Sequence, residues 1–337
     1  MLDVTWLGTL VVLAGGISTG CFPLPMKFTR NWAWENVWLL YSIVGLLLLP
    51  WVVALTAVPQ LMAVYRASSL RTLLLTTVFG FGWGVGNLLF GEAVALVGMA
   101  LTFAIVGGLS AAVGSLIPLI LLRPERLTQP SGLVILLGVT MTACGVAILG
   151  AAGREREKRL APQGASGSIV LGLLLCVASG FLGSMLNFSF VLGSGIAEEA
   201  VKRGASPGSG SHAIWAVAFL GGFMSNGGYG ALKLVRNRSW SRFRKGNSSV
   251  SGLLSALMGV LFCAGFLLYG QGATLLGMLG PVVGWPVFQA TTIMVSTAAG
   301  AASGEWRGAD RRFVCLNILG LTILVCSIVV LSIGNRL

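Results

Sequence analysis

Long apolar runs, separated by short polar or charged stretches, repeat along the whole chain. A run of about 20 apolar residues is long enough to cross the hydrocarbon core of a membrane as a helix. Ten such runs are present, and no remaining stretch is long enough to form a soluble domain. The pattern predicts an all-α membrane protein with spans at roughly 5–26, 37–58, 70–96, 99–122, 131–153, 168–192, 212–235, 250–272, 276–301 and 312–334.

One helical hairpin of this pattern, at 79–105, returns later in the chain at an offset of 179 residues. Residues 88–99 and 267–278 are identical at six of twelve positions without a gap, more than apolar composition alone would give. Because five spans is an odd number, a directly repeated half must insert upside down relative to its twin, as in the inverted repeats of secondary transporters. The predicted fold is ten transmembrane helices in two inverted five-helix repeats. The predicted units are residues 1–153, a cytoplasmic linker at 154–167, and residues 168–337.

Composition supports a membrane location. Hydrophobic residues make up 55% of the chain and charged residues 9%, with a mean hydropathy of +0.89, whereas charged residues are about 25% of a soluble domain. The 48 glycines suit close helix contacts, because helices in lipid associate through packing of small residues. Membrane lipids are therefore the expected surroundings of the chain.

The basic residues are divided unevenly between the two sides of the predicted bundle. With ten spans both termini share one side, which carries seven Lys and Arg, whereas the opposite side carries fifteen. Cytoplasmic loops of membrane proteins collect Lys and Arg, so the second side is predicted to be cytoplasmic and both termini lie outside. The net charge of +12 has this explanation, and no nucleic-acid partner is expected.

Residues that could carry enzyme chemistry are scarce. The chain has one histidine, His212, at the outer start of a predicted span, and its six cysteines show no CxxC spacing. Neither a metal site nor a Ser–His–Asp arrangement has the partners it would need. The sequence predicts no enzyme activity, no metal and no cofactor.

Glu92 is the one acid placed well inside a predicted span. A carboxylate there is costly and by default marks an ion path or a proton relay, so Glu92 is the first candidate for proton coupling. The alternative is that it reaches the cytoplasmic interface or caps a packing contact. Its counterpart at the 179-residue offset is the uncharged Gln271.

Glu35 is the second candidate for proton coupling, and it follows two cations, Lys27 and Arg30. One interpretation is a gate in which Glu35 pairs with Lys27 or Arg30. The other is an aromatic belt at the membrane interface, because Glu35 stands in the phrase W-x-W-E-x-x-W at a predicted helix N-terminus, where the helix dipole favours a carboxylate.

The other polar residues within the spans suit a neutral, hydroxylated solute. Amides offer donors and acceptors together, and a pocket that combines aromatic walls with a few convergent polar groups is the usual form for a small ligand. A sugar has both an apolar face and hydroxyl groups. Each residue also has a simple alternative role in core packing. The predicted contacts are Trp83, Asn87, Gln271, Trp285, Phe288 and Gln289, and further amides are Asn187, Asn226 and Asn317.

Several of these phrases together resemble one known family, the bacterial L-rhamnose–proton symporters of the drug/metabolite transporter superfamily. The resemblance covers nearly the whole chain, and the W-x-W-E-x-x-W and GWGxGN phrases are its most specific parts. The matching stretches are Cys21-Phe22 with Pro25-Met26-Lys27, residues 32–38, Pro50-Trp51, residues 79–87 with Gly91, residues 96–99, and Glu305-Trp306-Arg307 with Arg311-Arg312.

The resemblance implies a ten-helix fold of two inverted repeats and proton-driven uptake of a 6-deoxyhexose across the bacterial inner membrane by alternating access. Protons would be the coupling ion. Two stretches depart from the familiar pattern: the best-known members of the family have an apolar residue where Glu92 stands, and residues 284–289 differ. An exporter or exchanger on the same fold, or a membrane sensor that transports nothing, are the competing interpretations.

Overall fold

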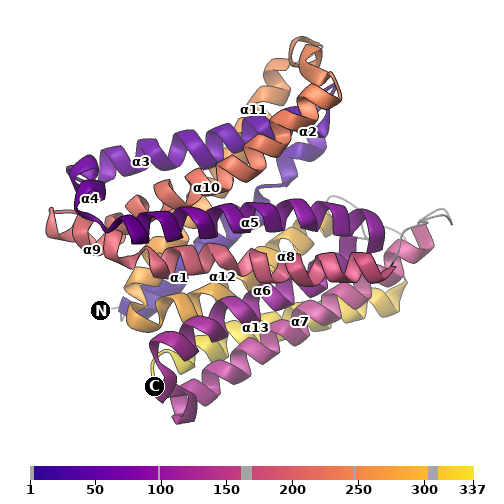
Figure 1. The fold of residues 1–337 in the computed structure, drawn as a ribbon. Coiled ribbons are helices and arrows are strands. Elements are labelled where there is room, and N and C mark those ends of the chain that lie inside the picture. Colours follow the sequence, from indigo (N-terminus) through magenta and orange to yellow (C-terminus); the bar gives the residue numbers. More distant parts are fainter. Residues whose placement is uncertain (1–3, 98, 161–168, 246–247, 303–309) are drawn as a thin grey trace.

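The structure is a computed structural model that describes residues 4–97, 99–160, 169–245, 248–302 and 310–337. All regular elements in these ranges are helices, which confirms the all-α prediction for the described residues (Figure 1). The longer helices are α1 (Val4–Cys21), α2 (Trp34–Ser42), α3 (Leu49–Ala57), α4 (Leu61–Ala67), α5 (Leu70–Val97), α6 (Met99–Leu122), α7 (Pro130–Leu160), α8 (Ile169–Leu192), α9 (Ser194–Lys202), α10 (Pro207–Arg236), α11 (Ser248–Leu275), α12 (Gly280–Ala302) and α13 (Arg311–Gly334). The short turns are η1 (Leu24–Phe28), η2 (Ile43–Leu48), η3 (Pro124–Thr128), η4 (Ser239–Arg244) and η5 (Gly277–Leu279).

Nine of the ten predicted spans match helices that are long and apolar enough to cross a membrane, counted over the described ranges. The exception is the predicted span at 212–235. It lies within α10, which is helical throughout but is not among the nine apolar candidates. The predicted linker at 154–167 begins as the last turns of α7, and its residues 161–167 lie outside the described part of the chain.

The reason for the polarity of α10 is its position inside the bundle. Residues 211–219 are all buried, and α10 packs against helices on several sides, including α2, α5, α9 and α11. A helical stretch that is buried all round contacts protein instead of lipid, whereas Met224, Leu232 and Val235 later in α10 are exposed. Its face can therefore carry Ser, His and Asn side chains that a lipid-facing helix would expose to hydrocarbon.

Close helix crossings are made by glycines. A methyl group at Gly80 of α5 would overlap the carbonyl oxygen of Ala218 in α10, and one at Gly221 of α10 would overlap the carbonyl oxygen of Thr77. Backbones in lipid can approach this closely only where the side chains are small. The glycines of α5 therefore fasten it to α10.

The two hairpins predicted from the repeat are both present. Helices α5 and α6 follow one another across position 98, which lies outside the described residues, and α11 joins α12 through η5. In η5 the backbone of Gly277 has a φ of +76°, a conformation that glycine adopts without a steric penalty. Both hairpins therefore turn within a few residues.

Helices α2 and α3 are joined by the π turn η2 and run on as one element. The N–H of Leu49 donates to the carbonyl of Val44, five residues back. Pro50 follows at once, and a proline cannot donate to the carbonyl four residues before it. The wider turn next to Pro50 is a usual way for a helix to accommodate such a break.

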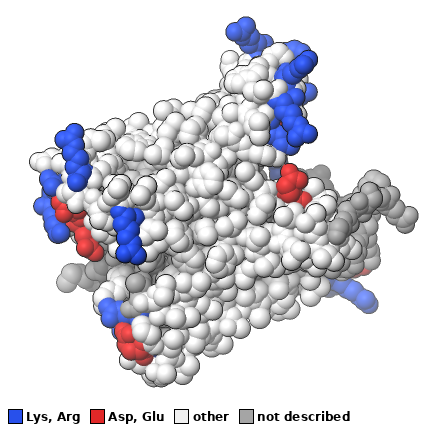
Figure 2. All heavy atoms as spheres, in the orientation of Figure 1, with Lys and Arg blue, Asp and Glu red and all other residues white. Residues whose placement is uncertain are grey.

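Charged side chains gather at the ends of the helices. On the face shown in Figure 2 the Lys, Arg, Asp and Glu side chains lie at the two ends of the bundle, and the surface between them is almost free of them. Large apolar side chains such as Leu74, Leu137 and Leu253 are exposed on this bundle. Both termini lie at the same end in Figure 1, the end where α4 and α9 lie.

Candidate functional site

A continuous aromatic cluster fills the space where α5, α8, α10, α11 and α12 meet, and all of its side chains are buried. The rings connect from one to the next. Trp83 stacks on Phe262 with centroids 5.5 Å apart, and Phe262 lies 4.8 Å from Phe266. The aromatic cluster consists of Trp83, Phe190, Trp215, Phe219, Phe262, Phe266, Tyr269, Trp285 and Phe288.

Three of the predicted solute contacts belong to this cluster. Phe288 lies 5.0 Å from Phe266 and stacks on Trp285 at 6.0 Å, so Trp83 and Trp285 stand at different ends of one path of rings. Asn87 is half-buried one turn beyond Trp83 on α5. The structure thus brings the tryptophans of the two hairpins into a single apolar wall.

Polar groups border the wall on the side of α6. The indole nitrogen of Trp285 donates to the backbone oxygen of Ser110 at 2.9 Å, and the amide nitrogen of Gln289 donates to the Ser110 hydroxyl at 3.3 Å. Two of the three predicted contacts on α12, Trp285 and Gln289, are therefore held by one residue of α6. Ser110 itself was not predicted, because nothing in the sequence shows that α6 and α12 are neighbours.

Asn187 connects α8 to α6, α11 and α12 through hydrogen bonds of its side-chain amide. Its amide nitrogen donates to the carbonyls of Gly114 at 2.7 Å and of Pro281 at 3.0 Å, and its oxygen accepts from the hydroxyl of Tyr269. Gly114 has a free carbonyl because Pro118, four residues later, lacks an N–H. The Asn187 amide supplies the missing donor.

In α12, too, a side chain from another helix donates to a carbonyl that a proline leaves without its helical partner. Pro286 leaves the carbonyl of Val282 without its helical partner, and the hydroxyl of Ser115 in α6 donates to it. A proline marks the free carbonyl four residues before it, so the sequence does signal both breaks. It does not show which side chains fill them.

Gln271, another predicted contact, lies outside the aromatic path and next to the only histidine. Its amide nitrogen is 3.1 Å from Nε2 of His212. His212 is 4% exposed, and its Nδ1 has no partner among the described residues. This pair joins α10 to α11.

Glu92, the first candidate for proton coupling, is exposed on α5. Its carboxylate accepts from the hydroxyl of Tyr229 in α10 at 3.4 Å. Among the described residues, no three His, Cys, Asp or Glu side chains lie together so that they could hold a metal ion.

Glu35 is 6% exposed and fastens the start of α2 to the end of α10. Its Oε1 accepts from the hydroxyl of Ser239 at 2.6 Å and from the amide of Asn237 at 3.1 Å. The side chains of Lys27 and Arg30 are exposed. The proposed gate between Glu35 and these two cations stays a prediction.

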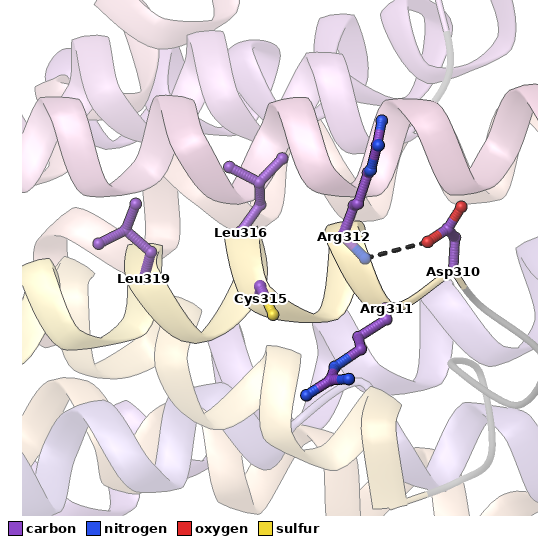
Figure 3. A pocket seen from close by; sticks show the side chains of 6 residues that line it. All are labelled: Asp310, Arg311, Arg312, Cys315, Leu316 and Leu319. Atoms are coloured by element: carbon purple, nitrogen blue, oxygen red, sulfur yellow. Dashed lines mark hydrogen bonds between the residues drawn. The ribbon is translucent and has the colours of Figure 1, made fainter.

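An open hollow of about 580 Å³ lies away from the aromatic cluster, at the start of α13 (Figure 3). Asp310 caps this helix by accepting from the N–H of Arg312 at 3.1 Å. Figure 3 shows the side chains of Arg311 and Arg312 pointing in different directions, so they do not converge on one point. Glu305, Trp306 and Arg307, which precede them in the sequence, lie outside the described residues.

Comparison with known proteins gives consistent matches over the full length. An L-rhamnose–proton symporter of Cronobacter sakazakii is 29% identical and covers 99% of both chains, and one of Salmonella gallinarum is 28% identical with the same coverage. An L-rhamnose–proton symporter of Escherichia coli is 27% identical, again over 99% of each chain.

A solved crystal structure is similar to this fold, with a TM-score of 0.56, 17% sequence identity and 98% coverage of each chain. Finally, the family model described as L-rhamnose-proton symport protein matches residues 1–336 of the 337. The chain is therefore a member of the L-rhamnose–proton symport protein family.

Proposed function

We propose that this chain imports a neutral sugar together with protons, and that L-rhamnose or a related 6-deoxyhexose is the sugar. Membership in the symporter family supports the proposal. The observation that carries it is the aromatic cluster bordered by amides and hydroxyls from both hairpins. A deoxy sugar has an apolar face for the rings and hydroxyl groups for the polar border.

The proposed sugar contacts are Trp83, Asn87, Trp285, Phe288 and Gln289, with Gln271 nearby. Because these side chains come from α5, α11 and α12, a movement of one hairpin relative to the other would open or close the site. Such a movement is the alternating access that inverted repeats perform in secondary transporters. We propose that the two halves of this chain form such repeats, and that α10 is the tenth span.

The proposed location is the bacterial inner membrane with both termini in the periplasm. The basic loops, counted on the opposite side, would then face the cytoplasm. A proton that enters with the sugar gains about 2.3 kcal/mol per 100 mV of membrane potential. That free energy is enough to concentrate a neutral solute by roughly 50-fold, since about 1.4 kcal/mol is a factor of ten.

The test uses purified protein in two forms. In detergent, a panel of hexoses and 6-deoxyhexoses is screened for thermal stabilisation, because a ligand that binds only the folded state raises its stability. In proteoliposomes, uptake of labelled L-rhamnose driven by a pH gradient is compared with counterflow at equal pH. We expect stabilisation by L-rhamnose, counterflow, and accumulation only with a gradient.

Other outcomes would contradict the proposal in distinct ways. Counterflow without gradient-driven accumulation would indicate an exchanger. A protein that no sugar stabilises, and that shows neither uptake nor counterflow, would indicate a sensor. Stabilisation by another hexose and none by L-rhamnose would keep the transport and change the sugar.

A further inference from the structure

The chain's single histidine is buried at the interface between α10 and α11, at the end of the bundle that holds the start of α10. His212 is 4% exposed and lies in the buried stretch 211–219. Sequence reasoning gave it no role. It is nevertheless the one imidazole in the protein, and imidazole is the side chain whose ordinary pKa lies closest to neutral pH.

The contact with Gln271 determines which ring nitrogen of His212 carries the proton. The amide nitrogen of Gln271 can only donate, and it lies 3.1 Å from Nε2 of His212. Nε2 is therefore the acceptor, and the neutral ring carries its hydrogen on Nδ1. That N–H is buried and has no partner among the described residues.

A second N–H lies unpaired on the same face of α10. The indole nitrogen of Trp215, three residues after His212, is also buried without a partner in the described part of the chain, and it lies against Gly270 of α11. An unpaired buried donor costs about 1–3 kcal/mol. Two of them at one helix interface point to a ligand or water that completes the site.

The 179-residue repeat gives this corner a counterpart. Gln271 aligns with Glu92, and both positions contact α10: Gln271 at His212, and Glu92 at Tyr229. The two α10 residues are 17 positions apart, or about 25 Å along the helix. One polar pair, His212–Gln271 or Tyr229–Glu92, therefore lies near each end of α10. Each pair contains one side chain, the imidazole or the carboxylate, that can bind a proton.

Among the described residues, no charged group is hydrogen-bonded to His212. Glu199 of α9, a helix that packs against α10, is paired with Lys202 and Arg203. Within the described residues the one hydrogen-bond partner of the His212 ring is Gln271. The titratable and charged side chains on the described elements around α10 are Glu35, Tyr41, Tyr65, Arg66, Arg71, Glu92, Cys176, Glu198, Glu199, Lys202, Arg203, Arg242, Arg244, Cys263 and Tyr269.

We propose that His212 is the outer proton-binding group of this transporter and that Gln271 is its positioning residue. The proposal rests on the proposed proton–sugar symport. A proton from the outer solution adds to Nε2, and the Gln271 amide rotates so that its oxygen accepts the new N–H. The N–H on Nδ1, already present on the neutral ring, then becomes a charge-assisted and stronger donor, directed to a hydroxyl oxygen of the sugar.

This arrangement explains why position 271 is a glutamine. An amide can donate to the neutral ring and accept from the charged one, whereas a carboxylate could only accept and would hold the ring permanently charged. A buried imidazolium without an acid beside it is unstable unless another group accepts its hydrogen. The sugar supplies that acceptor, so proton and sugar favour each other's binding, and both are released together on the inner side.

The first experiment observes the imidazole directly. Full-length protein without a histidine tag, labelled with ¹⁵N-histidine and placed in lipid nanodiscs, gives one imidazole signal because the chain has one histidine. We expect a titration between pH 4 and 9 whose midpoint rises by about half a pH unit with saturating L-rhamnose, equal to a roughly threefold coupling. An imidazole that does not titrate, or a midpoint that L-rhamnose leaves unchanged, would overturn the proposal.

The second experiment separates coupling from sugar binding. His212→Gln keeps a side chain that can form hydrogen bonds but cannot carry a proton at neutral pH. We expect at least tenfold less gradient-driven accumulation of L-rhamnose, while counterflow persists because the glutamine amide can still donate to the sugar hydroxyl. The matched control is Ser211→Ala, which removes a neighbouring buried hydroxyl bonded within its own helix and should change neither flux.

Each result decides the question. Full accumulation by His212→Gln would exclude the proton role, and so would a variant with the parent's melting temperature that loses counterflow, since His212 would then serve sugar binding alone. If the parent shows no flux of any 6-deoxyhexose, the proposed function fails, and the titration without sugar still reports whether His212 binds a proton.

Discussion

The hairpins α5–α6 and α11–α12 are related by the 179-residue offset, and they agree where helices cross. Gly80 and Gly259 are equivalent positions. A methyl at Gly80 would overlap the carbonyl oxygen of Ala218, and one at Gly259 would lie 2.8 Å from the backbone of Gly45. At both positions the neighbouring backbone is too close for a side chain. The shared glycines are thus explained by shared crossings.

The hairpins differ near the C-terminal ends of their first helices, α5 and α11. A methyl at Gly91 would have nothing within 4 Å, whereas one at the equivalent Gly270 would meet the Trp215 indole and the Ser211 hydroxyl. The next position is an exposed acid in α5, Glu92, and a half-buried amide in α11, Gln271. The comparison teaches that the two hairpins share their close helix crossings and differ in the chemistry beside them.

The largest expected effect is a loss of stability in a variant that lacks the hydrogen bonds of Asn187 to both hairpins. Asn187→Leu removes the donor to Gly114 and Pro281 and the acceptor of Tyr269, so we expect a loss on the order of 3–5 kcal/mol in the free energy of unfolding. Reversible unfolding in mixed micelles measures it.

A double-mutant cycle sharpens this prediction. Pro118→Ala gives the chain an N–H that can reach the Gly114 carbonyl, so Asn187→Leu should cost less in that background by about 1 kcal/mol. An equal cost in both backgrounds would contradict the assignment of the Asn187 amide to the proline break.

A smaller effect tests the difference at Gly91 and Gly270. Gly270→Ala forces the buried Trp215 ring to move, and overpacking of this kind costs about 1–3 kcal/mol. Gly91→Ala meets open space and should be neutral or stabilise by up to about 1 kcal/mol. Melting temperatures of both variants in one detergent decide it; equal losses would mean that the two hairpins are packed alike.

The third prediction concerns the polar border of the site. Gln289→Ala removes a bond to Ser110 and a proposed sugar contact, and it should weaken L-rhamnose binding about tenfold while changing unfolding by only about 1 kcal/mol. Isothermal titration calorimetry measures the affinity. Thr322→Ala on α13 removes an exposed hydroxyl bonded within its helix and is the control. Unchanged affinity in Gln289→Ala would remove this residue from the site.

The smallest effect on stability is expected for Glu92→Gln. The carboxylate is exposed and its contact with Tyr229 is 3.4 Å long, so the free energy of unfolding should stay within about 0.5 kcal/mol of the parent. Proton flux is the sensitive measurement. If Glu92 couples protons, L-rhamnose-driven alkalinisation should fall several-fold, and alkalinisation as large as in the parent would exclude it.

Much of the fold could be predicted because lipid imposes simple length and polarity rules. Within the described residues, nine predicted spans matched helices that are long and apolar enough to cross a membrane, and the repeat indicated the α5–α6 and α11–α12 hairpins. The polarity of α10 weakened its hydropathy signal, although the apolar pattern at 212–235 still indicated a helix there. Burial inside protein, which depends on the other helices, is what permits that polarity.

The candidate site was predicted in part. Aromatic residues and amides indicated Trp83, Trp285 and Phe288, which the structure joins in one cluster. The roles of Ser110 and Asn187 depend on which helices are neighbours, and side-chain periodicity does not specify helix neighbours. The two unpaired donors of the α10–α11 corner depend on tertiary structure in the same way.

The burial of α10 also has a consequence for how the protein is made. A segment with buried Ser, His and Asn side chains gains little by partitioning alone from the translocon into lipid. If α10 is the tenth span, as proposed, its insertion would be completed by association with helices already in the membrane, and α5 and α8, which precede it in the chain and pack against it, would be available first. Assembly of this transporter would then depend on the glycines at which α5 and α10 cross, before any sugar is transported. A side chain at Gly80 or Gly221 would prevent α10 from packing against α5 during synthesis.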